Sequence, residues 1–238
     1  MFLVAVLTNL LYPPACLLCD APAAPTQTVC SRCVRTLPVT LAPVCRGCGV
    51  ELRGAFDAVM DCAACRKAPR TFALARAPWR YDSTARMAVR RFKYARRWRL
   101  GRWLADGMAQ TAQASLPIEE ISAVVPVPLH WLKRRLAGWN PSEELAGTVS
   151  QRLGKPCRPR ALIRTRWTAT QTRLSWRGRS RNVREAFTAF PEAVRDQTLL
   201  LVDDVLTSGA TAEACARALK RAGARRVFVL TAARTPLE

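Results

Sequence analysis

The chain has 238 residues, half of them hydrophobic, so it can bury a sizeable core and is neither disordered nor fibrous. Lys and Arg number 38 against 17 Asp and Glu, which gives a net charge of +21 and indicates a polyanionic ligand, either nucleic acid or a phosphorylated small molecule. No stretch of the sequence approaches the ~18 apolar residues of a membrane span.

The chain begins with an apolar segment, residues 1–12, which has neither the basic start nor the cleavage site of a signal peptide. We expect this segment to form a short helix that packs on the rest of the protein. Without an export signal the expected location is the cytoplasm, where closely spaced cysteines bind metal rather than form disulfides.

Eight of the ten cysteines form four CxxC pairs within residues 1–68. A CxxC turn directs two thiolates to one centre, and two such turns complete the tetrahedral four-sulfur shell of zinc. The pattern therefore predicts two structural zinc ions and resembles a double zinc ribbon. The spacing leaves open whether each pair joins the next one or the first joins the third. The predicted ligands are Cys16, Cys19, Cys30, Cys33, Cys45, Cys48, Cys62 and Cys65.

The rest of the chain, residues 69–238, alternates strands and helices. We expect strands at 72–81, 121–127, 198–202 and 226–231, and helices at 83–95, 101–114, 141–153 and 210–222. Asn140 is the expected N-cap of the third of these helices, because Pro follows it at the first helical position. The alternation predicts an α/β fold, a parallel sheet with helices on both of its faces.

The most informative motif is the run from Leu199 to Thr211, in which a buried strand leads into two acids, a small hydroxyl-rich loop and a helix. The backbone N–H groups of such a loop and helix start bind phosphate, and Gly209 lets the backbone approach it closely. The two acids are placed to bind ribose hydroxyls. The loop is neither a Walker A loop nor a GxGxxG loop. The predicted site residues are Asp203, Asp204, Val205, Leu206, Thr207, Ser208, Gly209, Ala210 and Thr211.

This run resembles the 5-phosphoribosyl-1-pyrophosphate (PRPP) loop of type I phosphoribosyltransferases. Together with the CxxC pairs, further stretches over residues 13–231 resemble the ComF family of competence-associated proteins. These stretches are Phe92–Tyr94, Val125–Leu129, Gly138–Asn140, Arg164–Arg166, Thr170–Thr172, Arg181–Val183 and Ala186–Phe187. The family reads Arg-Gly-Phe-Asn-Gln where this chain has Ala137-Gly138-Trp139-Asn140-Pro141, so two polar side chains of that motif are replaced here.

The resemblance implies a double zinc ribbon over 1–68 and a type I phosphoribosyltransferase-like domain over 69–238. It implies PRPP or a related phosphoribosyl ligand, bound with Mg²⁺, and a loop on the pyrophosphate side at Pro126, Val127 and Pro128. It also implies a role in DNA uptake during natural transformation, with partners among the DNA-uptake proteins.

Two basic segments, 71–110 and 156–195, each hold ten basic and two acidic residues with aromatic residues between them. Such mixtures bind the phosphates of single-stranded DNA and stack on its bases. By the resemblance, the second segment forms a hood over the ligand. The candidate DNA contacts are Lys93, Tyr94, Arg164, Arg166, Arg173, Trp176, Arg177 and Arg181.

The favoured function is therefore that of a ComF-type protein that handles single-stranded DNA. Two alternatives stay open: an active phosphoribosyltransferase with an unidentified acceptor, and a module that senses PRPP and docks partners through its zinc ribbons. The charge pattern favours DNA, whereas the intact loop favours a retained small ligand. One chain can bind both.

Overall fold

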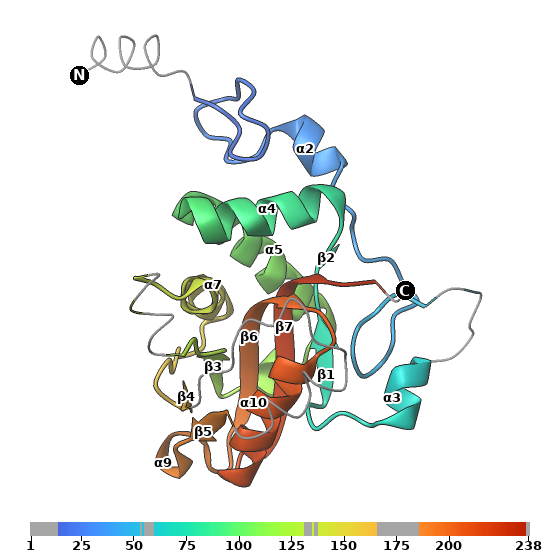
Figure 1. Cartoon of the computed structure of the whole chain (residues 1–238), viewed down its shortest axis with the longest axis vertical. Coiled ribbons are helices and arrows are strands. Elements are labelled where there is room, and N and C mark those ends of the chain that lie inside the picture. Colours follow the sequence, from blue (N-terminus) through green and yellow to red (C-terminus); the bar gives the residue numbers. More distant parts are fainter. Residues whose placement is uncertain are drawn as a thin grey trace.

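The computed structural model describes residues 14–52, 54, 60–130, 135, 138–165 and 186–236. The helix predicted over residues 1–12 lies outside this part of the chain. Two cysteine-rich modules, with the short helices α2 (Ser31–Arg35) and α3 (Ala63–Lys67), precede an α/β domain (Figure 1). Among the described helices none has both the length and the apolar character needed to cross a membrane.

The α/β domain is built on a parallel sheet in which β6 (Thr198–Leu206) and β7 (Arg226–Arg234) are the central neighbours. β3 (Ala123–Pro126) pairs with β6, while β1 (Leu74–Arg76) and β2 (Trp79–Arg80) pair one after the other with β7. The predicted fold class is thereby confirmed.

The strand expected over 72–81 is in fact two strands, β1 and β2, separated by Ala77 and Pro78. Proline has no N–H to donate and is confined to the edges and interruptions of sheets, which accounts for the break. Both strands lie at the edge of the sheet, where such a break is tolerated.

Helices cover both faces of the sheet, as the alternation predicts (Figure 1). α4 (Ser83–Ala95), α5 (Trp98–Ser115) and α7 (Pro141–Leu153) pack on one face, and α10 (Ala210–Arg221) packs on the other. Successive strand residues point to opposite faces, so the even-numbered Leu200 and Val202 of β6 join the core with α4, α5 and α7, while Leu199 and Leu201 join the core with α10. This explains why the run Leu199–Val202 within β6 is apolar at every position.

Most element bounds follow the sequence. Helix α4 has the predicted limits, and α7 begins as expected because the Asn140 side chain accepts a hydrogen bond from Ser142 N at 3.1 Å. β6 and β7 continue further than predicted, to Leu206 and Arg234. Several short elements carry too little periodicity to be predicted: the 3-10 turn Ile118–Glu120, α9 (Pro191–Val194), and the antiparallel pair β4 (Leu162–Arg164) and β5 (Phe187–Ala189).

The two cysteine-rich modules attach to the domain differently. In the first module Cys16 and Leu18 belong to the same buried core as α4 and α5. The second module has a small core of its own around Val50, and it reaches the sheet edge where Ala75 N donates to Gly47 O at 2.8 Å. The domain boundary at residue 68 stays a prediction.

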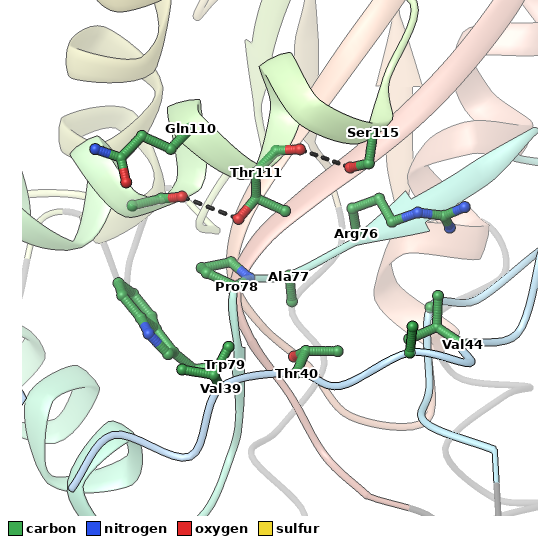
Figure 2. A pocket seen from close by; sticks show the side chains of 13 residues that line it. Val39, Thr40, Val44, Arg76, Ala77, Pro78, Trp79, Gln110, Thr111 and Ser115 are labelled. Atoms are coloured by element: carbon green, nitrogen blue, oxygen red, sulfur yellow. Dashed lines mark hydrogen bonds between the residues drawn. The ribbon is translucent and has the colours of Figure 1, made fainter. Parts of the chain in front are cut away.

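A pocket of about 410 Å³ lies between the linker of the two modules, the β1–β2 edge and α5 (Figure 2). The linker closes one side, since Thr40 N donates to Pro78 O at 2.9 Å. Trp79 lines the pocket and stacks on Trp103 with ring centres 5.3 Å apart. None of the described candidate site residues lines this pocket, which is therefore separate from the site below.

Candidate functional site

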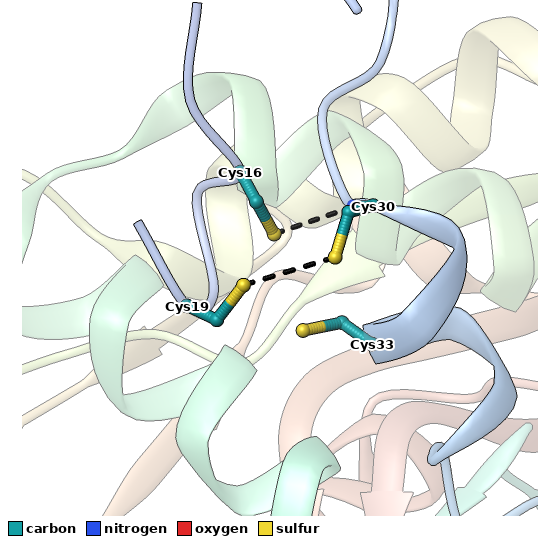
Figure 3. A group of neighbouring side chains, drawn as sticks. All are labelled: Cys16, Cys19, Cys30 and Cys33. Carbon is teal, nitrogen blue, oxygen red and sulfur yellow. Dashed lines mark hydrogen bonds between the residues drawn. The ribbon is translucent and has the colours of Figure 1, made fainter. Parts of the chain in front are cut away.

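The eight CxxC cysteines form two groups, and within each group the four Sγ atoms lie within 4.8 Å of one another. Each CxxC pair joins the next pair along the chain, so of the two arrangements that the spacing left open the crossed one is wrong. Figure 3 shows the first group. The groups are Cys16, Cys19, Cys30 and Cys33, and Cys45, Cys48, Cys62 and Cys65.

Both groups fit zinc. The Sγ–Sγ distances Cys19–Cys30 and Cys48–Cys62 are each 3.7 Å. A tetrahedral ion with Zn–S bonds of ~2.3 Å requires about 3.8 Å, whereas a disulfide requires about 2.05 Å. Burial alone would raise the pKa of Cys16, but hydrogen bonds from the backbone N–H groups of Cys30 and Leu18 lower it to about 6. Zinc bound at these sites would hold each module together.

The acid pair lies on β6 itself, because this strand continues past Asp203 and Asp204 to Leu206. The chain then turns into α10 through Gly209, which has φ +80°, a conformation that residues with a side chain disfavour. Ala210 N donates to Ser208 Oγ at 3.3 Å, which fixes the turn. The first amides of an α-helix lack partners within the helix, so this loop and the start of α10 together suit an anionic ligand.

Side chains from two helices converge on the acid pair. The Lys93 ammonium of α4 lies 2.6 Å from Asp204 Oδ2, with side-chain exposures of 31% and 13%. Ser142, in the first turn of α7, donates its hydroxyl to Asp203 Oδ1 at 2.9 Å. Burial and the neighbouring Asp204 charge raise the pKa of Asp203 to about 7. Burial would lower the pKa of Lys93, but Asp204 raises it, so Lys93 stays charged.

The loop after β3 adjoins this site because β3 and β6 are neighbours, with Pro126 in register with Val202. Val127 N donates to Val202 O at 2.9 Å, and Asn140 Nδ2 donates to Val127 O at 3.1 Å. The helix that follows β3 lies on one face of the sheet and the helix that follows β6 lies on the other. This is the topological switch point at which open α/β sheets bind ligands.

The predicted DNA contacts fall into four groups, of which Arg164 is described separately below. Lys93 contacts Asp204, within the site formed by the acid pair and the turn at Gly209. Tyr94 is 81% exposed at the end of α4, close in sequence to Trp98, which is 57% exposed at the start of α5. The Arg102 guanidinium lies 5.2 Å from the centre of the Trp98 ring. Five candidates lie outside the described residues: Arg166, Arg173, Trp176, Arg177 and Arg181.

Arg164 closes β4, and its guanidinium lies 5.5 Å from the centre of the Phe187 ring on β5. Burial lowers the pKa of Arg164. The described ends of the expected hood therefore form an antiparallel strand pair whose apolar side chains share a core with α10. The role of the hood as a cover over the ligand stays a prediction, because residues 166–185 lie outside the described part of the chain.

Sequence reasoning missed Ser142 and Arg234. Ser142 is two residues beyond the predicted N-cap, which places it at the helix start but does not reveal its contact with Asp203. Arg234 ends β7, and its Nη1 donates to Leu206 O at 2.9 Å. An arginine that follows an apolar strand cannot be distinguished in sequence from an ordinary exposed cation.

Known proteins share both parts of this arrangement. The double zinc ribbon domain family matches residues 7–69, and the phosphoribosyl transferase domain family matches residues 141–236. The DNA utilization protein YhgH of Salmonella typhimurium is 30% identical to this chain, covering 94% of it and 98% of the relative. Competence protein F of Haemophilus influenzae is 27% identical, covering 87% of this chain and 90% of the relative.

Proposed function

We propose a function in DNA uptake for this chain, which belongs to the ComF family together with the DNA utilization protein YhgH and competence protein F. The names of these relatives support a role in handling DNA. In this proposal the protein binds incoming single-stranded DNA in the cytoplasm. Its segment from Asp203 to Thr211, which comprises the end of β6 and the turn into α10 and is called the phosphate loop below, binds PRPP or a related phosphoribosyl ligand.

The exposed surface where α4 meets α5 carries the proposal of DNA binding. Between Asp82 and Asp106 the sequence holds eight basic residues and no acid. Two large aromatic rings, Tyr94 and Trp98, are exposed within this segment. Exposed rings among cations bind the unstacked bases of single strands, whereas duplex bases are already stacked. We call this set the α4–α5 surface: Arg90, Tyr94, Trp98, Arg99 and Arg102, all exposed.

The phosphate loop supports the proposal of a phosphoribosyl ligand. The left-handed Gly209 and the start of α10 suit a phosphate, and the carboxylates of Asp203 and Asp204 suit ribose hydroxyls. Carboxylate oxygens are also the ligands that Mg²⁺ prefers, so this pair fits the ion that accompanies PRPP. Mg²⁺ bound there would neutralise pyrophosphate charge.

Phosphoribosyl transfer is a second candidate function. The acid pair favours it, because this chemistry depends on positioning the ribose and neutralising the leaving pyrophosphate rather than on a covalent intermediate. An acidic and a cationic side chain lie together at the carboxyl end of β6: Asp203, whose pKa is raised to about 7, and Lys93, which pairs with Asp204.

Ligand-induced thermal stabilisation tests the loop. PRPP with Mg²⁺ at 100 times its Kd should stabilise the folded protein by about 2.7 kcal/mol, which corresponds to a rise in Tm of roughly 5–10 °C for a chain of this size. Asp204→Asn should abolish the rise. Asp106→Asn is the matched control, since Asp106 pairs with Arg152 on the surface, and it should keep the rise. No rise in the wild type would refute phosphoribosyl binding.

Fluorescence anisotropy with a labelled oligothymidylate tests the α4–α5 surface. Trp98→Ala should weaken binding by about 1–3 kcal/mol, the contribution of one stacked base. Leu41→Ala is the matched control, because Leu41 is an equally exposed apolar side chain on the linker, 61% exposed. Equal affinities of these two variants would remove the α4–α5 surface from the proposal.

A further inference from the structure

Arg234 connects the second cysteine group to the phosphate loop. Its guanidinium donates to Leu206 O at 2.9 Å, to Thr207 O and to Thr235 O at 3.0 Å. From the same side chain, Nε donates to Cys48 O at 3.3 Å and Nη2 lies 3.8 Å from Cys48 Sγ. Arg234 is only 7% exposed. One buried side chain thus contacts both a predicted zinc ligand and the backbone that forms the loop.

The chemistry of arginine explains why this contact can link the position of the Cys48 turn to that of the Leu206–Thr207 backbone. The guanidinium is planar and rigid, and its five N–H donors point in fixed directions. A buried cation also requires compensating partners, here the carbonyl oxygens of the loop and the sulfur of Cys48. The Cys48 turn and the Leu206–Thr207 backbone therefore cannot move independently without leaving donors of a buried charge unsatisfied.

A second connection lies beside the first. Arg70, five residues after the zinc ligand Cys65, brings its Nη1 to 3.6 Å from the position that a Cβ on Gly209 would occupy. The next residue, Thr71, donates its backbone N–H to Glu213 Oε2 at 3.0 Å in the first turn of α10. The segment that leaves the second cysteine group is therefore fixed to the helix whose start forms the phosphate site.

The first cysteine group is connected elsewhere. Leu17, between two of its cysteines, accepts hydrogen bonds from Arg91 of α4 at 3.3 Å and from Arg97 at 2.8 Å. These contacts run to α4 and to the residue before α5, and α4 in turn reaches the acid pair through Lys93 and Asp204. The chain therefore contains its own internal comparison: Arg234 joins one cysteine group directly to the loop backbone, whereas the other group reaches the site indirectly, through α4.

We propose that Arg234 is a positioning residue that couples zinc in the second cysteine group to ligand binding at the phosphate loop. Zinc at Cys45, Cys48, Cys62 and Cys65 holds the loop in its binding conformation, and an anion bound at the loop in turn strengthens the binding of that zinc. Such coupling is reciprocal by thermodynamic necessity. The ligand arm rests on the proposed phosphoribosyl function, whereas the link from zinc site to loop does not.

The test uses the full-length, zinc-loaded chain and two readouts. The first is hydrogen–deuterium exchange of the amides at 205–209, which needs no ligand. Arg234→Met should speed this exchange at least 10-fold while two zinc ions per chain are retained, and Arg234→Lys, which keeps the charge without the fork, should speed it by a smaller factor. Arg226→Met on the same strand is the control, because Arg226 pairs with Glu120 at the surface. Unchanged exchange in both Arg234 variants would overturn the proposal.

The second readout is alkylation of individual cysteines during treatment with a zinc-selective chelator, followed by mass spectrometry. PRPP with Mg²⁺ should slow alkylation of Cys48 and Cys62 at least fivefold and leave Cys19 and Cys30 unchanged, and Arg234→Met should remove this difference. Equal protection of both groups, or protection of neither while PRPP binds, would refute the coupling. If PRPP does not bind the wild type, the proposed ligand fails, and the exchange readout alone decides whether Arg234 positions the loop.

Discussion

Gly209→Ala separates the conformational requirement of the phosphate loop from simple packing. At φ +80° an added Cβ would lie 3.6 Å from Arg70 Nη1 and 3.9 Å from Leu206 Cδ1, which are ordinary contact distances. The cost is therefore conformational, about 1–2 kcal/mol for a residue with a side chain in the left-handed region. For a chain of this size, that free energy lowers Tm by roughly 2–8 °C.

The same substitution should weaken stabilisation by PRPP with Mg²⁺, because any strain that is relieved by a change in φ turns the amides of residues 209 and 210 away from the phosphate. Gly154→Ala is a matched control. Gly154 also has a left-handed φ, +64°, at the end of α7, and an added Cβ there meets nothing within 4 Å. Differential scanning fluorimetry of both variants should show similar losses in Tm, with the ligand response reduced only in Gly209→Ala. A full ligand response in Gly209→Ala would refute the reasoning.

Three further predictions address the acid pair, the zinc sites and the DNA surface. Folding raises the pKa of Asp203 from about 3.9 to about 7, so the free energy of unfolding should fall as pH rises from 4 to 7. Urea denaturation of Asp203→Asn should show a smaller fall over this pH range, and an unchanged fall would contradict the assignment to Asp203. Elemental analysis should find two zinc ions per chain, because both four-sulfur groups fit the ion, and a single ion would contradict the assignment of two zinc sites. Arg99→Gln combined with Arg102→Gln should reduce the dependence of log Kd on log salt by roughly 1.4 on single-stranded DNA, whereas an unaltered dependence would show that these cations do not contact phosphate.

The fold could largely be predicted because its signals are local. The run Leu199–Val202 is apolar at every position, as a strand covered on both faces must be, and Gly209 and Gly223 bracket an alanine-rich helix. A single strand over 72–81 is the prediction, yet Pro78 within that range is itself a signal of the break between β1 and β2. The β4–β5 pair was missed because each strand has three residues, too few for a period to appear.

The site could be predicted only as far as neighbouring residues determine it. Asp203, Asp204 and Gly209 are close together in sequence, and their order after an apolar strand already indicates a site for a ribose and a phosphate. The CxxC spacing could not give the zinc pairing, because pairing depends on how the modules fold back. Lys93 was expected on the DNA surface, yet it contacts Asp204, since the side of α4 that faces β6 is set by packing rather than by charge. The role of Arg234 could not be predicted, because it contacts Cys48 and Leu206, which are far from it in sequence.

The most direct test of the central claim is a comparison of single-stranded and duplex DNA binding by the wild-type protein over a range of salt concentrations. Anisotropy titrations with a labelled oligothymidylate and with a duplex of equal length should show tighter binding of the single strand. The single-strand affinity should fall steeply with salt, with a log–log slope of roughly 0.7 per neutralised phosphate. Equal affinity for the duplex, or an affinity insensitive to salt, would contradict a role in handling single-stranded DNA and would favour phosphoribosyl transfer as the function.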